Sequence, residues 1–90
     1  MRITFDPAKN ARNVEERGLA FEHVANLAWE SAVLQEDLRR DYGETRVRVL
    51  ALLGPRLHAA VITMRGDAMH VISFCKANRK EVAWYEQERG

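Results

Sequence analysis

Three apolar, β-branched segments separated by two short turns constrain the fold of this chain more than any other feature. The segments are residues 46–53, 57–64 and 68–74, with Gly54-Pro55 and then Arg65-Gly66-Asp67 between them. Gly-containing pairs of this kind are typical of tight turns. Strands joined by such short turns pair antiparallel, because a parallel crossover needs about a dozen residues or more. The sequence therefore predicts a three-stranded antiparallel meander.

Helix signals precede this meander. Asp6 and Pro7 form a good helix start, because the carboxylate can accept from the free N–H groups of the first turn and Pro needs no partner there. Gly18 supplies the matching stop. One face of this predicted helix carries polar side chains at four-residue spacing, namely Lys9, Asn13 and Arg17.

The remaining segments complete the predicted fold. A second short helix is expected over residues 21–29, where apolar residues recur at steps of three and four: Phe21, Val24, Ala25 and Ala28. Short strands are expected at 3–5 and 32–34, a loop at 37–45, and a last helix at 78–88 with Asn78 as its cap. The predicted class is α+β: a small antiparallel sheet, made of the meander plus one or two short strands, with two N-terminal helices and one C-terminal helix.

Length and hydropathy limit the organisation of the chain. Ninety residues are too few for two cores, so we expect a single domain over residues 1–90. The longest apolar run, 49–53, is far shorter than the roughly 20 residues that cross a bilayer. The N-terminal segment has no signal-peptide core, so a cytoplasmic protein without membrane contact is expected. A domain of this size also gains stability from an oligomer or a tightly bound partner.

The ionisable residues exclude some kinds of site. Cys75 is the only cysteine and the three histidines are scattered, so no metal and no cofactor are expected. The net charge of +1, from 14 basic and 13 acidic residues, gives no strong overall field. Any nucleic-acid binding must therefore come from a local basic patch.

Three segments resemble the BrnT family of toxins. They are FDPAKNARNVEERGLAFE at 5–22, GETR at 43–46 and HVISFCKANRKEVAWYE at 70–86. The last is the most specific, because an Ile-Ser-x-x-Lys-Ala run precedes a helix with Glu and Tyr four residues apart. Together they span nearly the whole chain.

The resemblance implies a RelE-like fold and a type II toxin: an RNA-cleaving enzyme that arrests growth. It also implies neutralisation by a BrnA-type antitoxin of ribbon-helix-helix class, through which the pair would bind operator DNA. The assembly would be a homodimer or a heterotetramer with the antitoxin.

Cleavage of RNA without a metal needs a base for the ribose 2′-hydroxyl, cations for the phosphorane oxygens and an acid for the leaving 5′-oxygen. Strand alternation puts Arg46 and Arg48 on one face, opposite Val47 and Val49. His58 and His70 would join that face if the strand register allows it. His70 has a side chain suited to proton transfer near neutrality.

Other candidates lie in the last segment. Lys76 and Arg79 flank the start of the final helix, where they would favour a phosphate. Glu81 and Tyr85 are one turn apart and could supply proton transfer or orientation. Trp84 is a candidate for the antitoxin interface, because large aromatic side chains often contribute much of the binding energy there. The catalytic candidates are Arg46, His70, Glu81 and Tyr85, and the RNA-binding candidates are Lys9, Arg48, Lys76 and Arg79. The alternatives stay open: a solvated charge run for 76–80, packing against the sheet for Tyr85, and a solvated helix face for Lys9.

Two departures from the family pattern open a second hypothesis. The family usually has Arg in place of Cys75 and commonly Arg in place of His70. A chain that lacks these cations could be a catalytically weakened homologue that binds antitoxin and tunes promoter repression. The first hypothesis is an active, metal-independent endoribonuclease.

Overall fold

The computed structural model describes residues 2–90, and over these it is an α+β protein with five strands, two α-helices and two 3-10 helices. In chain order the elements are β1 (Arg2–Phe5), α1 (Pro7–Arg17), η1 (Phe21–Asn26), η2 (Trp29–Ser31), β2 (Val33–Glu36), β3 (Val47–Leu53), β4 (Arg56–Arg65), β5 (Ala68–Lys76) and α2 (Arg79–Arg89). No helix among the described residues is long and apolar enough to span a membrane.

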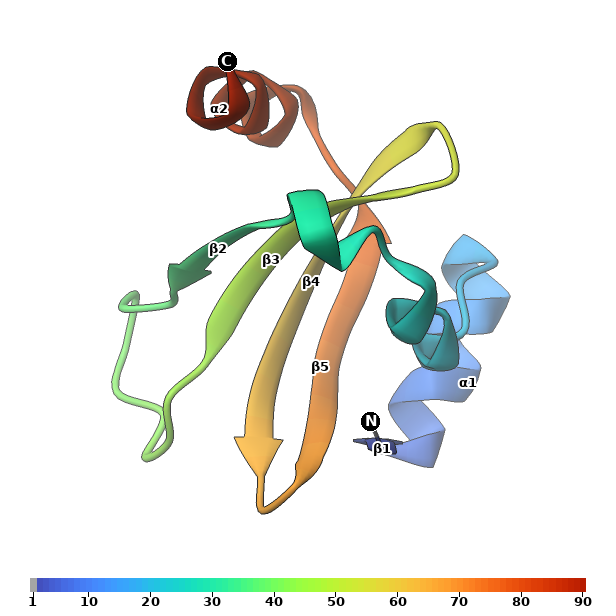
Figure 1. Cartoon of the computed structure of the whole chain (residues 1–90). Helices are drawn as coiled ribbons and strands as arrows, with labels where there is room; N and C mark the ends of the chain where they lie inside the picture. Colours follow the sequence, from blue (N-terminus) through green and yellow to red (C-terminus); the bar gives the residue numbers. More distant parts are fainter. Residues whose placement is uncertain (1) are drawn as a thin grey trace.

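The sheet has the strand order β1-β5-β4-β3-β2 (Figure 1). Strands β2 to β5 pair antiparallel, but β1 runs parallel to β5, so the sheet is mixed. The expectation of a purely antiparallel sheet was therefore wrong, while the α+β class is confirmed. Tight turns fix the direction of consecutive strands, whereas nothing local in the sequence fixes the direction of β1, which pairs with a strand far along the chain.

Alternation along the strands gives the sheet two different faces. Val47, Val49 and Ala51 of β3 point to one face, where they form the main core with buried side chains such as Phe74. The helices η1 and η2 cross this face, as the front view shows (Figure 1). We call it the covered face. Arg48 and the other intervening side chains point to the opposite face.

The segment predicted as a second α-helix forms two short 3-10 helices instead. Phe21, Val24 and Leu27 are its buried residues, and they recur every three positions. A 3-10 helix has three residues per turn, so this spacing lines up one apolar face. The predicted apolar face was Phe21, Val24, Ala25 and Ala28. Phe21 and Val24 are buried as expected, but Ala25 is exposed and Ala28 only half-buried.

Helix α1 begins and ends where the sequence predicts. The Asp6 carboxylate accepts from the backbone N–H of Ala8, and Gly18 ends the helix in the left-handed conformation at φ 68°. Asn13 donates to the backbone carbonyls of Leu19 and Phe74 at 2.9 and 3.0 Å. The helix is thereby fixed along the edge of β5 beyond the end of β1. Asn13 is thus a structural residue and not part of a solvated face.

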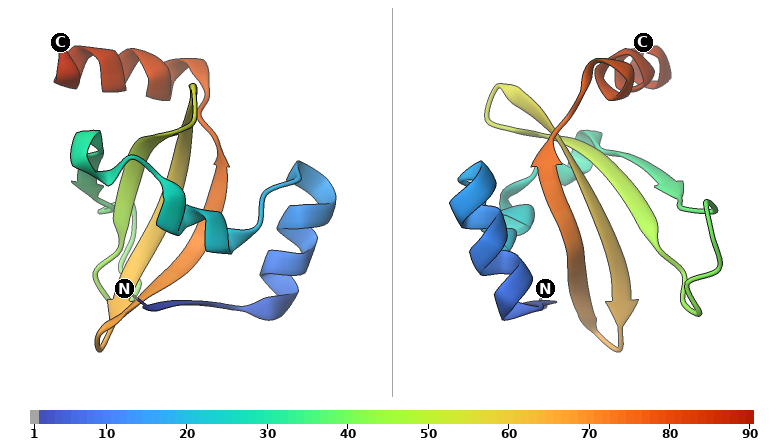
Figure 2. Two further views of the ribbon diagram at one scale, coloured as in Figure 1. Left: turned by 45° about the vertical axis from the view of Figure 1, so that its right-hand side comes forward. Right: turned by 180° about the vertical axis from the view of Figure 1, so that it is seen from behind.

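Helix α2 lies across one end of the sheet, on the side away from η1 (Figure 2). Asn78 and Glu81 form a reciprocal capping box, each side chain bonded to the other's backbone N–H. Val82, Trp84 and Tyr85 pack with a second cluster that includes Leu50 and Leu57. The helix covers only that end of the face, which positions its N-terminal turn at the border of an uncovered sheet surface.

Candidate functional site

The face of the sheet opposite η1 is uncovered between its two flanking helices. In the view from behind, α1 runs along the β5 side, α2 closes one end, and the loop after β2 lies on the far side (Figure 2). We call this surface the open face. It carries most of the polar side chains that come from strand interiors.

One row of side chains crosses the open face from β1 to β3. His70 pairs with Thr63 on β4 and with Thr4 on β1. Arg46 directly precedes Val47, which pairs with Ile62, so Arg46 continues the row beside Thr63. His70 and Arg46 are two strands apart, about 10 Å between Cα atoms at the usual strand spacing. Both side chains are long enough to meet one ligand between them.

His70 is held in a defined orientation. Its Nδ1 lies 2.8 Å from the hydroxyl oxygen of Thr4. In the tautomer in which Nδ1–H donates to that oxygen, Nε2 carries the lone pair that can accept a proton. Burial lowers the pKa of His70, and the positive charges of Arg65 and Lys9 lower it further, against Glu44 and Asp6, which raise it. The imidazole is therefore neutral near pH 7 and can accept a proton.

Arg46 is held on two sides. Its Nε donates to Glu44 at 3.3 Å, and its guanidinium lies 4.1 Å from the centre of the Tyr42 ring. Glu44 also pairs with Arg65 at 3.5 Å and so ties the start of β3 to the end of β4. Among the described residues, the terminal nitrogens of Arg46 make no hydrogen bond. They can therefore form the two-pronged contact that a phosphate prefers.

Arg48 lies one step further along the same face. Its Nη2 is 3.4 Å from Glu81, whose other carboxylate oxygen accepts from the backbone N–H of Asn78 at 2.8 Å. The capping box thus fixes the carboxylate that orients Arg48. A hollow of about 160 Å³ adjoins this pair, lined among others by Arg39, Ser73 and Cys75.

Cys75 is half-buried at the α2 end of the open face. Burial raises the pKa of its thiol, and the nearby Arg17 opposes this shift only in part. The side chain is therefore a neutral thiol at neutral pH. It supplies no positive charge to this part of the face.

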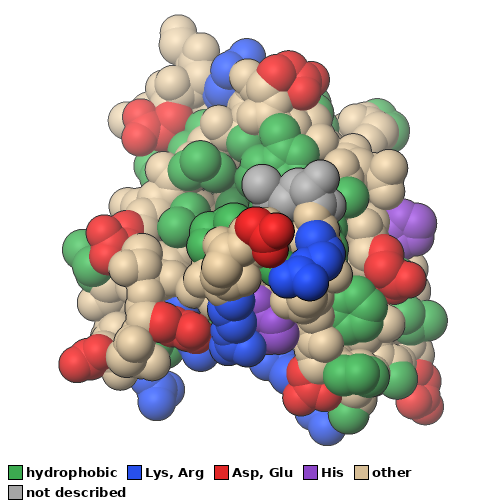
Figure 3. All heavy atoms as spheres, turned by 60° about the horizontal axis from the view of Figure 1, so that its bottom comes forward, with side chains coloured by type: hydrophobic (Ala, Val, Ile, Leu, Met, Phe, Trp, Pro, Cys, Tyr) green, Lys and Arg blue, Asp and Glu red, His purple; other side chains and the backbone are tan. Residues whose placement is uncertain are grey.

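The charges on this side of the molecule are mixed. Seen from the end that carries the β4–β5 turn, Lys and Arg side chains gather around a histidine, with acidic side chains among them (Figure 3). The acids restrain the cations: Glu44 holds Arg46, and Glu81 holds Arg48. The surface is a set of oriented arginines and not a uniform basic patch.

A family model described as the ribonuclease toxin BrnT of type II toxin-antitoxin systems matches residues 5–81. The chain belongs to the BrnT family. The predicted resemblance is confirmed, and with it the toxin class, the ribonuclease class and the existence of an antitoxin partner. No curated protein matches the chain at a significant level of similarity.

Two residues considered for this BrnT site point to the covered face. Lys76 is the pairing partner of His58, and the His58 ring packs 5.5 Å from that of Phe74 in the main core. His58 is 4% exposed and pairs with Ala51 of the core, so it does not join Arg46 and Arg48 on the open face. Lys76 is exposed, but on the side opposite Cys75 and at the end of the sheet remote from Arg46. Arg46 and Lys76 therefore lie on opposite faces of the sheet and do not form one phosphate-binding patch.

Three candidates on α2 also lie away from the row. The Tyr85 hydroxyl donates to the carbonyl of Ser31 at 3.2 Å and so fastens α2 to η2. Trp84 is half-buried in the second cluster. Arg79 lines a separate hollow with Arg56 on the outer side of α2. Glu81 alone among the α2 candidates meets the open face.

Several residues of the open face were not among the predicted site residues. Thr4 and Thr63 flank His70, and Arg65 shares the Glu44 carboxylate with Arg46. A threonine within a strand is a common residue, and its position beside a histidine depends on register. Tyr42 could have been singled out from the sequence, because it is the one aromatic residue in the charged segment 37–45.

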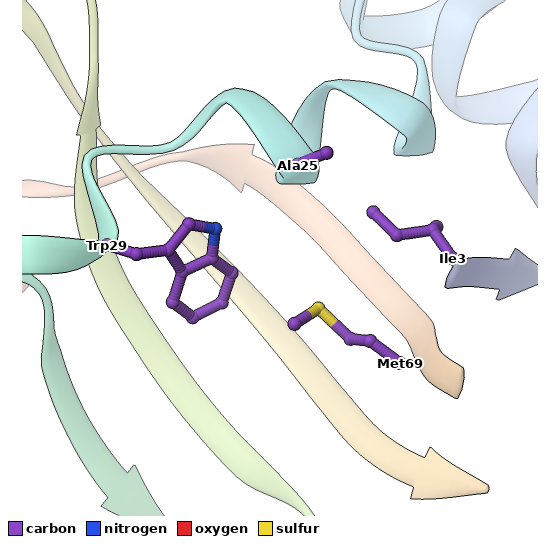
Figure 4. Close-up of a pocket in the computed structure, with 4 residues that line it drawn as sticks. All are labelled: Ile3, Ala25, Trp29 and Met69. Carbon is purple, nitrogen blue, oxygen red and sulfur yellow. The ribbon is translucent and has the colours of Figure 1, made fainter. Parts of the chain in front are cut away.

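A larger hollow of about 470 Å³ lies on the covered face of this BrnT protein. Ile3, Ala25, Trp29 and Met69 line it, and their side chains point toward one another (Figure 4). The indole N–H of Trp29 already donates to the carbonyl of Val24. The lining is therefore apolar and lacks the donors that a phosphate requires. Among the described residues, no three His, Cys, Asp or Glu side chains gather as a metal-binding group would.

Proposed function

We propose that this BrnT toxin is a metal-independent endoribonuclease whose active site is the open face. One observation carries the proposal: a neutral, oriented imidazole and an arginine with available donors occupy the same row of the same uncovered face. His70 is the general base, and Arg46 binds the scissile phosphate. Arg48 and Lys9 contact the phosphates on either side, and Glu81 orients Arg48.

The proposed step is internal transesterification. The ribose 2′-oxygen attacks the adjacent phosphorus while its proton passes to Nε2 of His70. Negative charge that develops on the phosphorane oxygens is stabilised by the guanidinium of Arg46. The bond from phosphorus to the 5′-oxygen breaks, and that oxygen takes a proton from solvent. The products are a 2′,3′-cyclic phosphate and a free 5′-hydroxyl.

We further propose that the antitoxin is of the BrnA ribbon-helix-helix type and acts by covering the open face. Trp84, half-buried on α2 beside the second cluster, offers it an aromatic anchor. The complex would then bind operator DNA only through the antitoxin. Its assembly would be a heterotetramer of toxin and antitoxin, or a toxin homodimer with antitoxin bound.

Free toxin would arrest growth in the cytoplasm. We also propose that its fold is related to that of the RelE-like ribonucleases.

The purified toxin is expected to cleave RNA equally well with and without EDTA, because its chemistry comes from imidazole and guanidinium groups. The measurement is the initial cleavage rate of a defined RNA at rising EDTA, with a metal-dependent nuclease as the inhibited control. End analysis should find the 2′,3′-cyclic phosphate. Loss of cleavage on chelation and recovery with a divalent ion would contradict the metal-free mechanism.

The neutral Cys75 favours a second candidate, a weakened toxin that serves mainly to bind its antitoxin. The position lies beside Arg48 and Glu81 and several residues along β5 from His70. An arginine there would add a phosphate contact next to the scissile one. Without that cation, the affinity for RNA would fall more than the rate of the chemical step.

Cys75→Arg is accordingly expected to tighten RNA binding and to steepen the fall of log affinity with log salt by about 0.7, as one more phosphate contact on a single strand requires. Binding titrations across salt concentrations, together with growth arrest in induced cells, measure this. Cys75→Gln is the matched uncharged control. Equal affinities and slopes for the wild type and Cys75→Arg would remove the argument for a weakened toxin.

A further inference from the structure

The Asp37 carboxylate, directly after β2, is buried and fully engaged. Its side chain is 1% exposed, whereas that of its partner Arg39 is 64% exposed. Arg39 donates to both carboxylate oxygens at 2.8 and 2.7 Å, and its backbone N–H donates at 3.2 Å. The Tyr42 hydroxyl is the fourth donor, at 3.1 Å. A buried carboxylate with this many donors is anionic and rigidly oriented.

This carboxylate is what orders the loop that follows it. Residues 38–45 include no buried side chain, so the loop has no apolar core of its own. Its ends are joined by the backbone bond from the Asp37 N–H to the Arg46 carbonyl at 2.7 Å. Between these ends, the bond from Tyr42 to Asp37 fixes the aromatic ring in place.

The ring of Tyr42 in turn supports Arg46. The guanidinium carbon lies 4.1 Å from the ring centre, a distance at which the attraction between cation and ring is significant. A continuous set of contacts therefore joins a buried acid to the arginine of the open face.

We propose that Asp37 is a positioning residue for RNA cleavage, which holds Arg46 against the scissile phosphate through the hydroxyl and ring of Tyr42. The inference rests on the proposed function and adds a role that chemistry at the open face alone does not assign. Burying a charge in this way is costly and seldom contributes net stability. Holding the Arg46 guanidinium in one orientation is a functional reason for burying this carboxylate.

A double-mutant cycle tests the route. Asp37→Asn is expected to lower kcat by about 10–10²-fold with little change in KM. A misplaced guanidinium stabilises the transition state less, while its charge still contributes to binding of the RNA. In an Arg46→Ala background the same substitution should lower kcat less than about twofold, since its target is gone. Asp67→Asn, which removes an exposed carboxylate paired with Arg2, is the matched control and should leave kcat unchanged.

Tyr42→Phe gives the same test without disturbing the buried acid. It keeps the ring and loses only the bond to Asp37, so it should lower kcat severalfold alone and have no effect with Arg46→Ala. If Asp37→Asn fails to fold by circular dichroism, this pair decides the question. Equal, multiplicative losses in both backgrounds would overturn the positioning role. Full activity of Arg46→Ala would instead contradict the proposed active site itself.

Discussion

His70→Gln is expected to lower kcat/KM for RNA by about 10²–10⁴-fold, because the variant keeps a polar side chain but loses the group that accepts the 2′-proton. The measurement is single-turnover cleavage of a defined RNA by the folded variant. His23→Gln, on the exposed side of η1, is the matched control and should retain full activity. A His70→Gln protein as active as the wild type would remove His70 from the mechanism.

The pH profile gives an independent check on the same residue. Burial and the cations Arg65 and Lys9 lower the pKa of His70, so the acid limb of kcat/KM should fall below the ordinary histidine value of 6.5. Protonation on that limb inactivates the base, so activity is lost as the pH falls through the pKa. Arg65→Gln removes one of the cations and should move the limb to higher pH. A limb that stays in place would mean that another group titrates.

Local signals explain what the sequence could predict of the fold. The glycine turns, the Asp6 and Asn78 caps and the alternation in β3 depend on neighbouring residues alone, and each lies where it was expected. The parallel pairing of β1 depends on a partner more than sixty residues away. The buried residues Phe21, Val24 and Leu27 recur every three positions, as a 3-10 helix requires. The segment was nevertheless predicted as an α-helix, whose apolar residues recur at steps of three and four.

A β-bulge explains why the site was harder to predict. Strict alternation along β5 would put His70, Ile72 and Phe74 on one face. In the structure the register shifts between Val61 and Ile62, which leaves Ile72 as an extra residue. His70 therefore shares the open face with Ser73, while Phe74 lies in the core. Arg48 on β3 and Arg46 just before it, where no such shift occurs, could be assigned to one face from the sequence.

Arg46→Lys is expected to lower kcat by about 10²–10³-fold, although it conserves the charge. The ammonium group of lysine cannot offer two parallel donors to a phosphate or stack as a plane on Tyr42. The variant should therefore bind RNA with nearly the wild-type salt dependence, since that slope counts charges. It should fail in the transition state, where an oriented donor is commonly worth this factor.

The measurement pairs RNA binding across salt concentrations with single-turnover cleavage. Arg89→Lys, at the exposed end of α2, is the matched control and should change neither. If Arg46→Lys cleaves RNA as fast as the wild type, positive charge alone suffices at this position. The stack on Tyr42 and the orientation that it gives the guanidinium would then have no part in catalysis, and Arg46 would act only as one of several phosphate contacts.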